Sequence, residues 1–310
     1  MALPRTAVLP AVALPLVATL PAADVPSVVS IDVFLSYWWI FPASVLFSTI
    51  AISAGVSGAL FFSPFFLFAV GLTPAQAIGA GLLTEVFGMG NGLRSYVRQG
   101  LVDYTVAKWL LVGALPAIVL GAFLAHRIDH GLLLTAFGIG LLSLGGFLVV
   151  YTSPERAEAA SEYVGGGDGP WGSDERVVEA RDGTIYRYPA CSHAPGVGLA
   201  TVGGFVTGLI SAGLPEITTT QLVVRCRIPP RVAVATSVFV LAIAALAGAT
   251  VHALSATPAW YAVGWSIPGV LVGSTVGSHL GKYVPGGVME SALGVVFGVV
   301  GLFVLLVEVL

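Results

Sequence analysis

Long apolar stretches dominate this chain and restrict its possible folds more than any other feature. Runs of about 18 residues or more with hardly a charge recur from Trp38 onward, the length a helix needs to cross a bilayer. Only 9% of the residues are charged, against roughly 25% in a soluble domain. The chain therefore has too few charged side chains to form the surface of a soluble protein. We therefore expect an all-α integral membrane protein, folded as a polytopic helical bundle.

The chain divides into four parts. Residues 1–38 contain a proline-interrupted apolar stretch, which is either a cleaved signal peptide or, as we favour, a retained signal-anchor. Residues 39–151 and 196–310 are two apolar blocks that we expect to span the membrane. The polar, acidic loop 152–195 separates them, and its turn sequence Arg181-Asp182-Gly183 predicts a small β-hairpin.

The two apolar blocks resemble each other, which predicts two homologous repeats. Each block contains four apolar segments in the same order, and prolines and glycines recur at a nearly constant offset. At an offset of 156 the matched pairs are Pro74 with Pro230, Ala77 with Ala233, Gly138 with Gly294, and Gly145 with Gly301. At an offset of 152 they are Pro116 with Pro268 and Gly121 with Gly273.

The arginines indicate that the two repeats face opposite ways. They lie at corners with no charged counterpart in the other block: Arg94 and Arg98 in the first, and Arg225, Arg227 and Arg231 in the second. Positive charge in short loops marks the cytoplasm, so this pattern is typical of inverted repeats in secondary transporters. The alternative is two parallel halves of plain spans, in which 39–71 and 196–226 are long kinked helices.

The first apolar segment of each block is interrupted by helix-breaking residues. The interruptions are Ala54-Gly55-Val56-Ser57-Gly58 and Ser211-Ala212-Gly213-Leu214-Pro215. In the inverted arrangement 196–226 must begin and end on the cytoplasmic side, as a re-entrant hairpin with two halves too short to cross. Irregular backbone at membrane depth persists only where it is buried in protein or lines a cavity, so the breaks predict the central site.

The residues around the breaks resemble the sulfite exporter TauE/SafE family, also called the 4-toluene sulfonate uptake permease family. The resemblance covers about 39–151 and 196–305 and rests on short motifs in order: 54–59, 62–64, 71–74 and 84–88, then 208–213, Glu216, 225–229 and 234–237. Ser57 and Leu214 stand where the family pattern has glycine, and the 152–195 loop is long. The resemblance implies export or uptake of sulfur-containing anions such as sulfite, sulfoacetate or other organosulfonates.

Polar groups beside the two breaks are the candidate substrate-binding residues. They are Gly55, Ser57, Gly58 and Ser63 in the first block, and Ser211, Gly213, Glu216, Thr218, Thr219 and Gln221 in the second. Hydroxyls and the free N–H groups of half-helix N-termini suit an oxyanion without any buried arginine. The alternative for each side chain is an ordinary hydrogen bond between helices.

Two carboxyl groups, those of Glu85 and Glu216, lie within apolar segments. An ionised carboxylate at mid-bilayer costs roughly 2.5–3.5 kcal/mol, so each must be buried in protein or face a cavity. We hypothesise that they couple transport to protons, and the alternative is a hydrogen bond to backbone freed at a helix break. Glu85 is expected to lie farther from its break than Glu216, so we expect it to matter less.

The cysteines and histidines predict no special chemistry. Cys191 and Cys226 lack metal-ligand spacing and form no C-x-x-C pair, which favours small apolar side chains over a redox pair. His126, His130 and His252 lie near helix ends, where we expect solvated caps.

Transport is the function class that the sequence favours. It contains no H-E-x-x-H, nucleophile elbow or P-loop, so we expect no enzyme, cofactor or metal site, and a net charge of -3 argues against nucleic acid. We expect a multi-pass carrier in the cell (inner or plasma) membrane, surrounded by the lipid bilayer, that moves a small anion by alternating access. Homo-oligomerisation stays open, and the alternative functions are a passive anion channel or an intramembrane enzyme.

Overall fold

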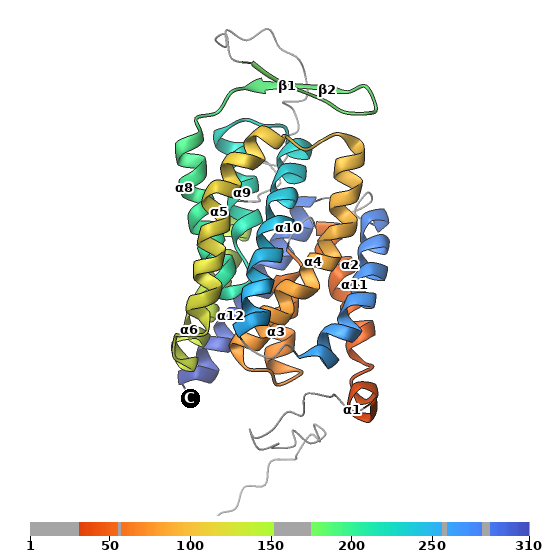
Figure 1. Cartoon of the computed structure of the whole chain (residues 1–310), viewed down its shortest axis with the longest axis vertical. Coiled ribbons are helices and arrows are strands. Elements are labelled where there is room, and N and C mark those ends of the chain that lie inside the picture. The colour runs from red at the N-terminus through yellow and green to blue at the C-terminus, as the bar shows by residue number, and fades with distance from the viewer. Residues whose placement is uncertain (1–30, 55–56, 152–174, 256–258, 281–285, 310) are drawn as a thin grey trace, which may run out of the picture.

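A computed structural model describes residues 31–54, 57–151, 175–255, 259–280 and 286–309. Residues 1–30 of the predicted N-terminal signal-anchor segment (1–38) and the candidate residue Gly55 lie outside these ranges. Within them the chain is a bundle of helices with one two-stranded sheet at one end (Figure 1).

Helix α1 (Ile31–Ser36) precedes the first block. The described residues of that block fold into five helices: α2 (Ile40–Ala54), α3 (Ala59–Phe68), α4 (Pro74–Gln99), α5 (Tyr104–Ala125) and α6 (His130–Tyr151). The loop contributes β1 (Glu175–Glu179) and β2 (Ile185–Pro189). The second block contains α8 (His193–Ile210), α9 (Leu214–Thr220), the π-helix η1 (Gln221–Arg225), α10 (Pro230–Ser255), α11 (Trp260–Leu280) and α12 (Gly286–Val309).

The helices fit a membrane environment. Among the described residues, α5, α8 and α10 are long and apolar enough to cross a bilayer by length and composition. Shorter apolar stretches lie in α2, α3, α6 and α12. Large apolar side chains such as Val112, Leu254 and Val299 are more than half exposed, which suits contact with lipid. The predicted all-α membrane fold is confirmed.

The break in the second block separates α8 from α9. Ser211 adopts a left-handed conformation (φ 62°) and Gly213 has φ 119°, a value that favours glycine. The Leu214 N–H, which has no acceptor within α9 because it lies in the first turn, donates to Thr207 Oγ1 over 2.8 Å. The predicted break at 211–215 is confirmed.

The chain then folds back along α8. Gln221 Nε2 donates to the Gly196 carbonyl (3.3 Å) and the Arg225 guanidinium to the Ser192 carbonyl (3.0 Å), so the end of η1 lies beside the start of α8. The two arms are unequal, because α8 has 18 residues, or about 27 Å, whereas α9 and η1 together have 12, or about 18 Å. By length and composition α8 can cross a bilayer, so the expectation that both halves are too short to cross is wrong. We call residues 193–225 the second folded-back segment.

The first block contains a similar reversal between α2 and α3, which we call the first folded-back segment (residues 40–68). The Phe65 ring lies 5.6 Å from Trp39 and 5.1 Å from Phe47, and the Phe47 ring stacks on Phe61 at 5.9 Å. α3 therefore runs back alongside α2. A long kinked helix through either break, the alternative expectation, is wrong.

Glycines bring three helix pairs into backbone contact. A Cβ built on Gly121 of α5 would lie 2.3 Å from the Phe205 carbonyl of α8, and one on Gly273 of α11 would lie 2.4 Å from the Val45 carbonyl of α2. In the α6–α12 pair, a Cβ on Gly145 would lie 2.6 Å from the Gly294 carbonyl. Small residues permit such close approach, which drives helix association in lipid.

The predicted β-hairpin is confirmed. β1 and β2 pair antiparallel, and Arg181 N–H donates to the Gln99 carbonyl at the end of α4 (2.9 Å). Asp103, the N-cap of α5, accepts from Tyr188 Oη (2.8 Å) and pairs with Arg176 (3.5 Å). Burial and the Asp103 carboxylate raise the pKa of Tyr188. The hairpin is thus fixed to one end of the bundle, the hairpin end, and α1 lies at the opposite end (Figure 1).

Cys191 and Cys226 form a disulfide, with their Cα atoms 5.2 Å apart. The expectation of two separate apolar thiols is wrong. The 35-residue separation conceals the pairing, because the second folded-back segment returns the end of η1 to the linker that precedes α8.

We expect Gly145→Ala to lower stability by about 1–3 kcal/mol, the range for overpacking a tight contact. Gly146 is a matched control, because a Cβ there would meet nothing within 4 Å. Gly146→Ala should be neutral or slightly stabilising, since alanine is the better helix former. Thermal unfolding of both purified variants in detergent tests this, and equal melting temperatures would argue against the α6–α12 contact.

Candidate functional site

Ser57 joins the two helix breaks at the centre of the bundle. Its N–H donates to Glu216 Oε1 (3.3 Å), and its hydroxyl donates to Glu85 Oε1 (2.6 Å). These contacts connect the break in the first block, helix α4 and the start of α9. All three residues are buried, with exposed fractions of 1% for Ser57, 2% for Glu85 and 7% for Glu216.

Glu216 holds the irregular backbone of the second break. Its Oε2 accepts from Gly213 N–H (3.1 Å), one of the donors that an α-helix leaves free at its N-terminus. Its Oε1 accepts from Ser57 across the interface between the blocks. Both carboxyl oxygens are therefore bound by neutral backbone donors, one from each break.

A second polar contact between the blocks lies beside the first. The hydroxyls of Ser63 in α3 and Ser211 at the end of α8 are hydrogen bonded. Ser211 Oγ also donates to the Ile210 carbonyl (2.6 Å), so Ser63 is the donor in the pair. Both side chains are fully buried. The two breaks thus meet through two separate side-chain contacts.

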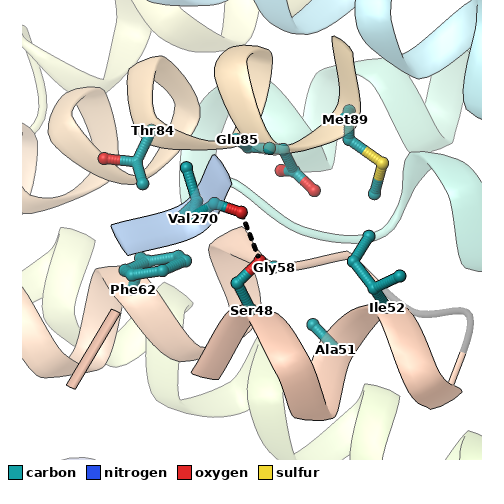
Figure 2. A pocket seen from close by; sticks show the side chains of 10 residues that line it. Ser48, Ala51, Ile52, Gly58, Phe62, Thr84, Glu85, Met89 and Val270 are labelled. Carbon is teal, nitrogen blue, oxygen red and sulfur yellow. Dashed lines mark hydrogen bonds between the residues drawn. The ribbon is translucent and has the colours of Figure 1, made fainter. Parts of the chain in front are cut away.

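Glu85 lines a small cavity between α2, α3, α4 and α11. The lining residues are Ser48, Ala51, Ile52, Gly58, Phe62, Thr84, Glu85, Gly88, Met89 and Val270. Figure 2 shows the Glu85 carboxyl between Met89 and Thr84, facing Gly58 and Ser48. Glu85 Oε2 has no hydrogen-bond partner in the described part of the chain. The cavity measures about 10 Å³, roughly the limit for one water molecule, so it has no room for a polyatomic anion in this conformation.

The structure gathers most of the predicted site residues at the two breaks. Ser57, Gly58, Ser63, Glu85, Ser211, Gly213 and Glu216 all lie there. The expectation that Glu85 lies away from its break is wrong, because the backbone reversal after α2 carries Ser57 back against the middle of α4.

The remaining predicted residues lie in helical surroundings. Thr218 donates to the Leu214 carbonyl of its own helix (2.6 Å), and Gln221 donates to Gly196 nearer the hairpin end. Thr219 is half-buried. Gly55 is outside the described residues.

A histidine pair lies near the same site, at the end opposite the hairpin. His252 is buried, with 3% exposed, and not a solvated cap as expected. Its Nε2 lies 3.1 Å from the Gly208 carbonyl, an acceptor, so Nε2 carries the proton and Nδ1 accepts from His126 Nε2 (2.9 Å). The pair holds the last turn of α8 against α5 and α10.

Sequence reasoning missed this histidine pair and eight cavity residues: Ser48, Ala51, Ile52, Phe62, Thr84, Gly88, Met89 and Val270. A Cβ on Gly79 would lie 2.8 Å from His252 Cβ. Glycine at position 79 leaves room for the His252 side chain, and it is the one sequence signal of this buried histidine. The signal can be interpreted only when the pairing of α4 with α10 is known.

Comparisons with known proteins agree with this architecture. The profile of the sulfite exporter TauE/SafE family matches residues 40–304. The probable membrane transporter protein YunE of Bacillus subtilis (strain 168) is 24% identical over 211 residues, which are 68% of this chain and 73% of that protein. A probable membrane transporter protein of Xylella fastidiosa (strain 9a5c) is 32% identical over 98 residues, 31% of this chain and 37% of that protein. No solved structure is significantly similar to the chain.

We expect Ser57→Ala to lower stability by about 1–3 kcal/mol, because it leaves a buried carboxyl oxygen without its donor. Ser143→Ala is the control, since that exposed hydroxyl donates to the Ile139 carbonyl of its own helix. Thermal unfolding of Ser57→Ala, Glu85→Gln and the double variant gives the coupling energy of the pair. Additive effects would show that the Ser57–Glu85 bond contributes nothing.

Proposed function

The chain belongs to the sulfite exporter TauE/SafE family of membrane transporters, and we propose that it is a secondary carrier for a small sulfur-containing anion such as sulfite or an organosulfonate. The observation that carries the proposal is the meeting of two helix breaks at Ser57, between two buried carboxyl groups. Hydroxyls and half-helix ends at such breaks are the groups with which transporters contact small anions near mid-membrane.

We propose further that the two blocks are inverted repeats, and their glycine contacts support this. A Cβ on Gly138 would meet the Gly301 carbonyl at 3.2 Å, and one on Gly145 would meet the Gly294 carbonyl at 2.6 Å. In the sequence Gly138 matches Gly294 and Gly145 matches Gly301. Such reciprocal contacts are what a two-fold axis between homologous halves produces.

The charge distribution supports an orientation in the cell membrane in which the hairpin end faces the cytoplasm. Nine basic residues lie towards that end: Arg94, Arg98, Lys108, Arg176, Arg181, Arg187, Arg225, Arg227 and Arg231. In the described part of the chain, Arg127 is the basic residue at the opposite end. Excess Lys and Arg marks the cytoplasmic side of a multi-pass protein.

Two carboxyl groups beside an anion site favour proton coupling. Two unit charges 4 Å apart repel by about 4 kcal/mol at an effective dielectric constant of 20, so an ionised Glu216 disfavours a bound anion. Uptake of a proton by Glu216 or Glu85 removes this repulsion, and release of the proton restores it. The anion and the proton therefore travel together, and the site opens to each side of the membrane in turn.

Proton-coupled flux of sulfite or an organosulfonate in proteoliposomes tests the carrier. We expect Glu216→Gln to fold and bind substrate, but to reduce proton-coupled flux to background and flatten its pH dependence. Glu85→Gln should flatten it as well, because both carboxyls contact Ser57.

Glu179→Gln, on the exposed surface of β1, is the control. Non-saturating flux that ignores a proton gradient would instead indicate a passive channel. An unchanged pH profile in both site variants would leave the carboxyls with a structural role.

Single cysteines in a Cys191→Ser/Cys226→Ser background test the orientation. We expect His130→Cys, in an exposed corner, to react with an impermeant maleimide added to intact cells. Asp182→Cys, at the exposed tip of the β-hairpin, should react only after the cells are permeabilised. The opposite pattern would invert the proposed topology.

A further inference from the structure

We propose that Cys191 and Cys226 form a thiol–disulfide exchange site on the cytoplasmic face, and that the bond locks the second folded-back segment. The partner in the exchange is a small cytoplasmic thiol or dithiol. The inference rests on the orientation proposed above, and the two cysteines are the complete set in the chain.

The bond lies at the base of the segment that carries Glu216. Cys191 lies in the linker between β2 and α8, and Cys226 follows η1 directly. The bond therefore closes α8, α9 and η1 into a covalent loop. While it is intact, the two arms of the segment cannot separate at their base.

The compartment makes such a bond unusual. The bond lies beside Arg225 and Arg227, at the end where the basic residues gather. Thiols in the cytoplasm are kept reduced, and disulfides found there are mostly transient, catalytic or redox-sensing. A disulfide between these two residues on the cytoplasmic face is therefore reversible in the cell.

The surroundings of the two sulfurs favour attack on Cys191 and release of Cys226. Cys191 is half-buried, whereas only 4% of Cys226 is exposed. An incoming thiolate attacks the Cys191 sulfur, forms a mixed disulfide with it and releases the Cys226 thiolate. The Arg225 guanidinium lies 3.6 Å from Cys226 Sγ, where its positive charge stabilises that leaving thiolate.

A second thiolate completes the reaction by attacking the mixed disulfide. It releases the Cys191 thiolate and leaves the two small thiols joined as a disulfide. Two electrons thus pass from the small thiols to the protein. Oxidation by a small-molecule disulfide runs the same steps in reverse.

Non-covalent contacts keep the two thiols close after reduction. Arg225 donates to the Ser192 carbonyl, and Gln221 donates to the Gly196 carbonyl, both across the base of the segment. These hydrogen bonds can break and re-form during transport, whereas the disulfide cannot. The oxidised carrier is therefore the locked state and the reduced carrier the working state.

A gel-shift assay tests the exchange in cells. Acid-quenched membranes are treated with a polyethylene-glycol maleimide, which reports this bond alone because the chain has two cysteines. We expect both to react in untreated cells, neither after the thiol oxidant diamide, and both again after recovery. Persistent protection in untreated cells, or thiols that diamide cannot join, would overturn the exchange site.

Flux in proteoliposomes tests the lock. We expect the oxidised protein to transport roughly fivefold more slowly or worse, the lower end of typical coupling between sites, and dithiothreitol to restore the rate. The flux of the Cys191→Ser/Cys226→Ser variant should change neither with the oxidant nor with dithiothreitol. Equal rates in the two redox states would overturn the lock. An absence of flux in both states would count against the carrier function instead, and the gel shift would still decide whether exchange occurs.

Discussion

Backbone groups freed by a helix break must find partners inside the protein, because hydrocarbon offers none. Two breaks lie in this bundle, and one carboxyl group serves both. Glu216 accepts from Gly213 N–H in its own break and from Ser57 N–H in the other. The packing of the two blocks against each other at the centre thus depends on a side chain that can also carry a proton. Glu216 therefore serves both the structure and the proposed coupling of transport to protons.

Glycine packing determines where the breaks meet. Backbone-to-backbone contacts at Gly121 and Gly273 hold the long arms of the two folded-back segments against α5 and α11. The chemistry on this scaffold is not duplicated. At the offset of 156, Glu216 corresponds to Leu60 and Glu85 to Leu241. If the two blocks are the repeats proposed above, they carry one acidic site that the symmetry does not duplicate, so the two carboxyls need not change protonation together.

Features encoded in local sequence were predictable, and features created by long-range pairing were not. The breaks and the β-hairpin follow from glycine, proline and turn signals, so their positions were found. The Cys191–Cys226 bond and the burial of His252 arise from segments far apart in the chain. Ser57 was selected as a hydroxyl beside a break, but its contact with Glu85 required knowing how the chain reverses after α2. A single apolar sequence contains little information about which helix faces touch, since almost every face is apolar.

The second folded-back segment is held at three depths, and in the proposed carrier this arrangement links its movement to transport. The disulfide and Arg225 fix the base of the segment. Glu216 fixes the start of α9 to the first block. Near the opposite end, His252 fixes the last turn of α8 at Gly208. Opening the site towards either face requires the contacts on that face to loosen while those on the other hold. The contacts at the base include a covalent bond, whereas those at the centre and opposite end are hydrogen bonds to ionisable side chains. Under the orientation and transport cycle proposed above, redox state therefore acts on the cytoplasmic side of the carrier, and protonation acts on the centre and the opposite side.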